Sequence, residues 1–166
     1  MQIFIANIDS ISKNPDIYAA LLSAGDKKRT GTFQKQTRKL QFILGHLIAD
    51  NCGGAYTSIA HRDNWVVVAA ADSPVGVDIE NTTIQRDFAS AGELMNLPKI
   101  KSLDDFYKSF TESEAVYKLG AKSKCTQFTR HGDYLICATS TQDFVMPQIQ
   151  DFDINSILPA EKEQGN

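Results

Sequence analysis

The part of the chain that most constrains its fold is residues 57–80, where three short apolar segments follow one another with only brief turns between them. Residues 57–61 and 65–71 are rich in β-branched, aromatic and small apolar side chains, and they flank the polar turn at residues 62–64. A second turn at residues 72–74 ends in proline and leads into residues 75–80. The pattern predicts a small antiparallel meander of three strands.

The third of these segments carries two carboxylates, Asp78 and Glu80, separated by one apolar residue. Side chains alternate between the two faces of a strand, so Asp78 and Glu80 share one face while Val77 and Ile79 point into the opposite layer. Two neighbouring carboxylates offer the oxygen ligands that Mg²⁺ prefers. Gly76 leaves space for a close approach to the backbone. A strand that ends in solvated acids has the same pattern, so these residues alone leave both interpretations open.

The size and composition of the chain indicate one compact globular unit over residues 1–166. The length suffices for one core but is short for two ordinary domains. Apolar residues make up 42% and charged residues 22%, which is typical of globular proteins. The formal net charge of −3 lacks the strongly basic character of nucleic-acid-binding proteins, so we expect no nucleic acid as a partner.

Three cysteines, Cys52, Cys125 and Cys137, form no C-x-x-C pair, and their odd number argues against a disulfide framework or a zinc ribbon. No apolar run reaches the ~18 residues of a membrane span. The first residues also lack the charged segment that begins a signal peptide. We therefore expect a cytoplasmic protein with reduced thiols and no membrane association.

The rest of the chain alternates between helix and strand patterns. We predict helices at residues 16–24, 33–50, 88–97 and 103–118, with Gly25 and Pro98 ending the first and third, and strands at residues 1–8 and 134–138. The expected fold class is α+β, with two related halves at about residues 1–80 and 81–158. Residues 159–166 form a polar, flexible tail in this prediction.

Charged residues on the predicted helices have two interpretations each. Basic residues concentrate between positions 27 and 39, where they form either a solvated face or a clamp for phosphate groups. Glu114 and Lys118 lie four residues apart and therefore on the same side of their helix. They form either a surface ion pair or a third carboxylate and a cation next to the acidic strand. His61 is either a structural histidine or a member of the same site.

Two stretches occur in an order that is specific to one enzyme family. Residues 75–80 have the sequence Val-Gly-Val-Asp-Ile-Glu, and residues 110–118 have the sequence Phe-Thr-Glu-Ser-Glu-Ala-Val-Tyr-Lys. These stretches resemble the paired motifs of the 4′-phosphopantetheinyl transferases. Residues 58–66, Ser-Ile-Ala-His-Arg-Asp-Asn-Trp-Val, are similar to the segment that precedes the acidic strand in that family. Because the acidic motif lies in mid-chain, the resemblance is to the Sfp-type, pseudo-dimeric branch, with a short second half.

The resemblance implies a fold, a reaction and a set of residue roles. The fold would be 4′-phosphopantetheinyl transferase-like, with a small antiparallel sheet packed on helices in each half, and the protein would be a monomer. The reaction would transfer 4′-phosphopantetheine from coenzyme A to a serine of an apo acyl or peptidyl carrier protein and release adenosine 3′,5′-bisphosphate. The implied roles are Mg²⁺ binding by Asp78, Glu80 and Glu114, catalysis by Glu114 and Lys118, and coenzyme A binding by Lys28, Arg38 and His61.

The chain departs from the family motifs at two positions. Ser113 replaces a lysine that precedes the motif glutamate, and Ala60 replaces a serine that precedes His61. An alternative is therefore a degenerate homologue that binds coenzyme A or a carrier protein without turnover. A further alternative is an unrelated Mg²⁺-dependent phosphohydrolase that uses the same carboxylates. The sequence does not distinguish among fatty-acid, polyketide, peptide-synthetase and specialised-lipid carriers.

Overall fold

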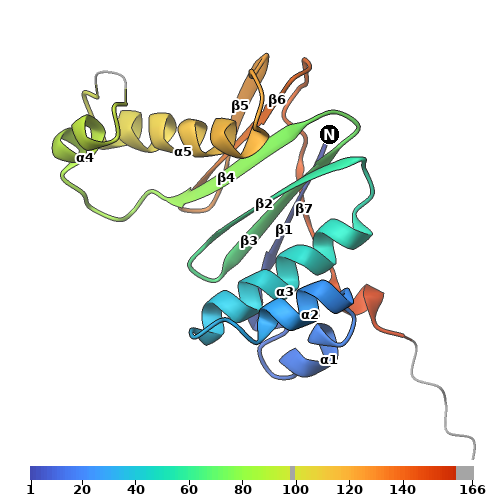
Figure 1. Ribbon diagram of the computed structural model, residues 1–166. Coiled ribbons are helices and arrows are strands. Elements are labelled where there is room, and N and C mark those ends of the chain that lie inside the picture. Colours follow the sequence, from blue (N-terminus) through green and yellow to red (C-terminus); the bar gives the residue numbers. More distant parts are fainter. Residues whose placement is uncertain (98–99, 160–166) are drawn as a thin grey trace, which may run out of the picture.

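The computed structural model describes residues 1–97 and 100–159 and has α+β architecture (Figure 1). In chain order the elements are β1 (Gln2–Asn7), η1 (Ile8–Ser10), α1 (Pro15–Ala19), α2 (Ala24–Thr30), α3 (Gln36–Asn51), β2 (Tyr56–Arg62), β3 (Trp65–Ala71), β4 (Val75–Asn81), α4 (Phe88–Leu94), α5 (Leu103–Leu119), β5 (Cys125–His131), β6 (Tyr134–Ser140), β7 (Ile149–Asp151) and η2 (Ile154–Ile157).

The strands form two sheets. The first has the order β2-β3-β1-β7, in which only the β1–β7 pair is parallel, and the second has the antiparallel order β4-β6-β5. The prediction of a three-strand meander is therefore wrong in its last strand. The hairpin of β2 and β3 forms as expected, but β4 pairs with β6 in the other sheet, with Asp78 opposite Cys137. This long-range pairing leaves no signal in the short turn at residues 72–74.

Apolar side chains alternate between layers along each strand. On β1, Ile3 and Ile5 join a central cluster with Val77 and Ile79 of β4, so residues of both sheets share this core. The other face of the first sheet packs on α3, while the other face of the second sheet packs on α5. Figure 1 shows these two helices on opposite outer sides of the strands. Asp78 and Glu80 alternate with Val77 and Ile79 and so lie on the α5 side.

Helix α3 and helix α5 confirm the predicted helices at residues 33–50 and 103–118 to within a few residues. The predicted helix at residues 16–24 is confirmed in its first part and wrong in its end, because α1 ends at Ala19 and a separate helix, α2, begins at Ala24. Ser23 caps α2 by accepting a hydrogen bond from the backbone amide of Asp26, so Gly25 lies inside a new helix rather than ending the previous one. Helix α4 ends at Leu94, while Pro98 and residues 160–166 lie outside the described residues.

The two sheets are built by similar chain paths. In the first, β1 leads through α3 to the β2–β3 hairpin, and the last strand of that hairpin pairs with β1. In the second, β4 leads through α5 to the β5–β6 hairpin, and the last strand of that hairpin pairs with β4. Across residues 1–97 and 100–159, no helix is long and apolar enough to cross a membrane.

Candidate functional site between the acidic strand and its neighbours

A close contact between a helix and the acidic strand builds one side of the candidate site. Gly76 on β4 lies directly under α5, where an added Cβ would come within 2.0 Å of the carbonyl oxygen of Ala115. Glycine is therefore required here, because any side chain would push the helix away from the strand. The contact brings the α5 residues Glu114 and Lys118 to the strand that carries Asp78 and Glu80.

Asp78 forms a buried ion pair with Lys118. The carboxylate is only 10% exposed, and Lys118 Nζ donates hydrogen bonds to Asp78 Oδ1 at 2.6 Å and to the carbonyl oxygen of Val77 at 3.2 Å. Burial raises the pKa of Asp78 above its ordinary value, and Lys118 opposes that rise. The charge of Glu114 raises the pKa further, so Glu114 lies close enough to interact electrostatically with Asp78.

Glu80 has a separate cation, which comes from the first sheet. Its side chain is 9% exposed, and its Oε2 atom lies 3.4 Å from the NH1 atom of Arg62 at the end of β2. Burial raises the pKa of Glu80, and the charge of Arg62 lowers it. Arg62 therefore connects the first sheet to the acidic strand. A second connection is the hydrogen bond from the backbone amide of Val77 to Ser58 Oγ at 3.1 Å.

Three buried polar atoms in this cluster have no hydrogen-bond partner: Asp78 Oδ2, Glu80 Oε2 and Arg62 Nε. Buried polar atoms are usually paired, because leaving one unsatisfied costs about 1–3 kcal/mol. Two unsatisfied carboxylate oxygens on the same face of one strand fit a hard cation, which commonly takes one or two protein carboxylates and completes its shell with water and phosphate oxygens. Within the described part of the chain, no three His, Cys, Asp or Glu side chains gather as a ready metal site. Asp78 and Glu80 thus supply an incomplete ligand set.

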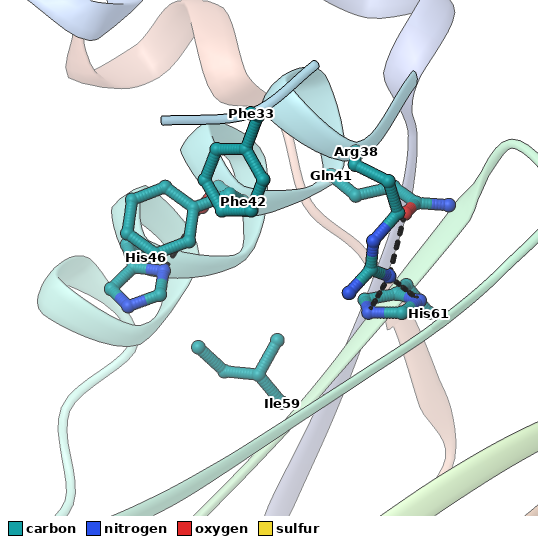
Figure 2. A pocket seen from close by; sticks show the side chains of 7 residues that line it. All are labelled: Phe33, Arg38, Gln41, Phe42, His46, Ile59 and His61. Carbon is teal, nitrogen blue, oxygen red and sulfur yellow. Dashed lines mark hydrogen bonds between the residues drawn. The ribbon is translucent and has the colours of Figure 1, made fainter. Parts of the chain in front are cut away.

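A pocket lies beside this cluster, between α3 and β2 (Figure 2). Its volume is about 180 Å³, and its lining combines apolar and basic groups: Phe33, Arg38, Gln41, Phe42, His46, Ile59 and His61. Figure 2 shows Arg38 and His61 pointing toward each other on one side of the pocket, with the rings of Phe33 and Phe42 on the other. The two phenylalanine ring centroids are 5.1 Å apart. The pocket therefore offers an aromatic wall facing a cationic one.

Arg38 is held at the edge of this pocket by two neighbours. Its NH1 group donates to Gln41 Oε1 at 3.0 Å and lies 2.8 Å from His61 Nδ1, and it also contacts Nε2 of the same ring. Burial lowers the pKa of His61 to about 4, and the charges of Arg38 and Lys118 add to this effect. His61 is therefore neutral at pH 7 and accepts from Arg38. His61 lies on β2 with Ser58, which accepts a hydrogen bond from the Val77 amide of β4, so the pocket adjoins the acidic strand.

The structure places six of the seven expected residues in two adjoining parts of the site, but within the described residues Glu114 does not gather with Asp78 and Glu80 as a three-ligand group. Asp78, Glu80, Glu114 and Lys118 lie around β4 and α5, and Arg38 and His61 line the adjoining pocket. Lys28 is the exception, since it is exposed on α2 and does not line the pocket. Its neighbour Arg29 instead lies over the ring of Phe42, with 4.7 Å from its guanidinium carbon to the ring centroid.

Sequence reasoning missed several residues that surround these groups, chiefly Arg62, Gln41 and the aromatic pair Phe33 and Phe42. Phe33 begins the predicted helix at residues 33–50, where aromatic residues usually serve packing. The sequence predicts a turn at Arg62. Its position at the end of β2 gives no sign that its partner would be Glu80 on another sheet.

A scan against models of known protein families finds no match to this chain, and a search among curated proteins finds none either.

Proposed function

We propose that this protein is a 4′-phosphopantetheinyl transferase with the two-halved fold of the Sfp-type branch, acting on apo acyl or peptidyl carrier proteins. One observation carries the proposal: two buried carboxylates with unsatisfied oxygens lie under a helix that presents Glu114 and Lys118, next to a pocket with aromatic and cationic walls. Such a site suits a substrate that combines a nucleotide with a diphosphate. Coenzyme A is a substrate of that kind.

The pocket would receive the nucleotide part of coenzyme A. Flat aromatic side chains such as Phe33 and Phe42 can stack on a nucleobase, which is a sequence-tolerant and favourable contact. Arg38 would bind a phosphate group through its guanidinium, which matches phosphate oxygens in a bidentate geometry. Neutral His61 accepts from Arg38 and so orients the guanidinium without adding charge. Lys28, on the exposed surface of α2, would contribute longer-range attraction for the same phosphates.

The carboxylates would hold the magnesium ion that such a reaction uses. Asp78 and Glu80 would bind it through their unsatisfied oxygens, and Glu114 would add a third carboxylate from α5. A bound magnesium ion supplies positive charge to the diphosphate oxygens and so makes the leaving phosphate more stable.

Glu114 and Lys118 would act on the reacting groups. The serine hydroxyl of the carrier attacks the β-phosphorus of coenzyme A, and Glu114 accepts its proton. The bond between that phosphorus and the bridging oxygen breaks, and its electron pair leaves with adenosine 3′,5′-bisphosphate. Lys118 stabilises the charge that develops on the phosphate oxygens. Both side chains stand one turn apart on α5, so the Gly76 contact positions them together.

The alternative is a homologue that binds coenzyme A or a carrier protein without turnover, and it rests on Ser113 and Ala60. Ala60 is 2% exposed in the central core and does not line the pocket. Ser113 lines a groove between α4 and α5, together with Met95 and Val116. Neither position lines the pocket that contains Arg38 and His61. These placements leave Arg38 and His61 free of both substitutions, which is compatible with transfer. A cytoplasmic location and a monomeric state are parts of the same proposal.

Intact-mass measurement of carrier proteins tests the proposal. The protein is incubated with coenzyme A, Mg²⁺ and a panel of apo carriers from fatty-acid, polyketide, peptide-synthetase and specialised-lipid systems. A transferase adds one phosphopantetheine group to at least one carrier. A binding protein leaves every carrier unmodified although coenzyme A binds, and a phosphohydrolase consumes coenzyme A without modifying any carrier. Either of the last two results would refute the proposal.

A further inference from the structure

Each carboxylate of the acidic strand has its own cation, and the two cations come from different parts of the chain. Lys118 of α5 binds Asp78 at 2.6 Å, and Arg62 of β2 lies 3.4 Å from Glu80. Each of these two ion pairs therefore joins one negative and one positive charge, and Glu114, Asp63 and Arg86 add further charge around them. Such pairing is expected where carboxylates are only 9–10% exposed, because an uncompensated buried charge is costly.

The two cations are the more accessible members of the cluster. The side chains of Lys118 and Arg62 are 28% and 26% exposed, two to three times as much as their partners. The polar contacts of Arg62 are long. Its Nε atom has no hydrogen-bond partner and lies 3.9 Å from the nearest oxygen of Asp63, which is beyond hydrogen-bond distance. The carboxylates are fixed by the strand, whereas the ends of both long basic side chains are partly exposed and lie where they could also meet a bound anion.

We propose that Lys118 and Arg62 are exchangeable counter-ions, which stabilise Asp78 and Glu80 in the free protein and pass to a bound diphosphate when a divalent cation takes their place. The site then binds the divalent cation and the diphosphate cooperatively. This inference rests on the metal role of the acidic strand in the proposed function, but it does not depend on transfer to a carrier.

The pairing of charges explains the cooperativity. A divalent cation that binds the unsatisfied carboxylate oxygens on its own places its charge beside the ammonium and guanidinium groups, and it competes with them for the same two carboxylates. A diphosphate alone must approach a cluster in which the basic groups already have partners. When both ligands bind, the carboxylates hold the metal and the basic side chains hold phosphate oxygens, so every charge keeps an opposite neighbour. The unsatisfied Asp78 Oδ2 and Arg62 Nε atoms also gain partners.

Two titrations of Lys118→Met test this inference, with free Mn²⁺ measured by electron paramagnetic resonance and diphosphate binding measured by calorimetry in the presence of Mn²⁺. Without Lys118, Mn²⁺ alone should bind about tenfold more tightly, since no ammonium competes for Asp78, a change equal to about 1.4 kcal/mol. Diphosphate should bind about tenfold more weakly in Mn²⁺, since one of its cations is gone. A structural role for Lys118 would weaken both ligands rather than shift them in opposite directions.

Control variants keep the test decisive. Arg62→Met should produce the same opposite shifts, and it provides an independent measurement if Lys118→Met does not fold. Lys108→Met removes an exposed lysine that pairs with Asp104 at 2.8 Å and should leave both titrations unchanged. Unchanged or weaker Mn²⁺ binding in the folded Lys118 and Arg62 variants would overturn the inference. Neither titration contains a carrier protein. If the protein modifies no carrier but its variants still show the opposite shifts in Mn²⁺ and diphosphate binding, the proposed function is refuted and this inference stands.

Discussion

Replacing Gly76 with alanine places a methyl group where the backbone of α5 already lies. The new Cβ would be 2.0 Å from the carbonyl oxygen of Ala115 and 2.9 Å from the amide nitrogen of Leu119. Both obstacles are backbone atoms of one helix, so no rotamer change can relieve the clash, and α5 must move by about 1 Å or more to reach ordinary contact distances. Overpacking of this kind typically costs 1–3 kcal/mol.

We therefore expect Gly76→Ala to lower the free energy of unfolding by about 3 kcal/mol. For a chain of this size, that corresponds to a fall in melting temperature of about 6–12 °C, because each kcal/mol shifts it by about 2–4 °C. Transfer activity should fall as well, since Glu114 and Lys118 move away with the helix.

Urea denaturation of Gly76→Ala and of Gly25→Ala measures the effect against a matched control. An added Cβ at Gly25 would meet only Ser23 Oγ at 3.9 Å, so that variant should be as stable as the natural protein or slightly more stable. A Gly76→Ala protein within about 0.5 kcal/mol of the natural one, which is the usual range for neutral surface changes, would refute the close approach of α5 to β4.

Three further predictions concern single residues of the site. Arg38→Ala should raise the KM for coenzyme A more than it lowers kcat. It should also raise KM more than Lys28→Ala does, because Arg38 lines the pocket and Lys28 does not. Steady-state kinetics in which the two variants have equal KM values would contradict this prediction. Nuclear magnetic resonance titration should give His61 a pKa of about 4. Because the unfolded chain binds a proton at this residue more readily, the free energy of unfolding should decline as the pH falls from 6.5 toward 4. A pKa near 6.5 would refute the burial of His61 beside Arg38. Burial raises the pKa of Asp78, so the free energy of unfolding declines as the pH rises above 3.8. Asp78→Asn should therefore be more stable than the natural protein at pH 7 but not near pH 3. Equal urea denaturation curves for the two proteins at pH 7 would contradict this prediction.

Local patterns predicted much of the secondary structure but not the long-range pairing of strands. The apolar run at residues 65–71 and the turn before it specify the β2–β3 hairpin, and the apolar spacing of residues 103–118 specifies α5. The partner of β4 is β6, more than fifty residues away in the chain, so nothing near the acidic strand reveals it. The parallel strand β7 was missed for the same reason, since its three residues gain their structure only by pairing with β1.

In the candidate site, too, local patterns predicted which residues share a face, but not which residues meet across elements. Alternation along a strand predicted that Asp78 and Glu80 share a face, and helical spacing predicted that Glu114 and Lys118 do. Sequence spacing could not predict that Lys118 would reach across to Asp78, because this contact depends on the close approach at Gly76. The pairing of Arg62 with Glu80 depends in turn on how the edges of the two sheets meet.

The central claim is that the acidic strand carries out transfer of phosphopantetheine, and intact-mass measurement with Asp78→Asn tests it most directly. Natural protein and variant are incubated at equal concentrations with coenzyme A, Mg²⁺ and the carrier that the natural protein modifies best. We predict that the natural protein adds one phosphopantetheine group to the carrier, whereas Asp78→Asn adds none although it is folded at least as stably. Transfer by Asp78→Asn at the natural rate, or no modification of any carrier by the natural protein, would contradict the account.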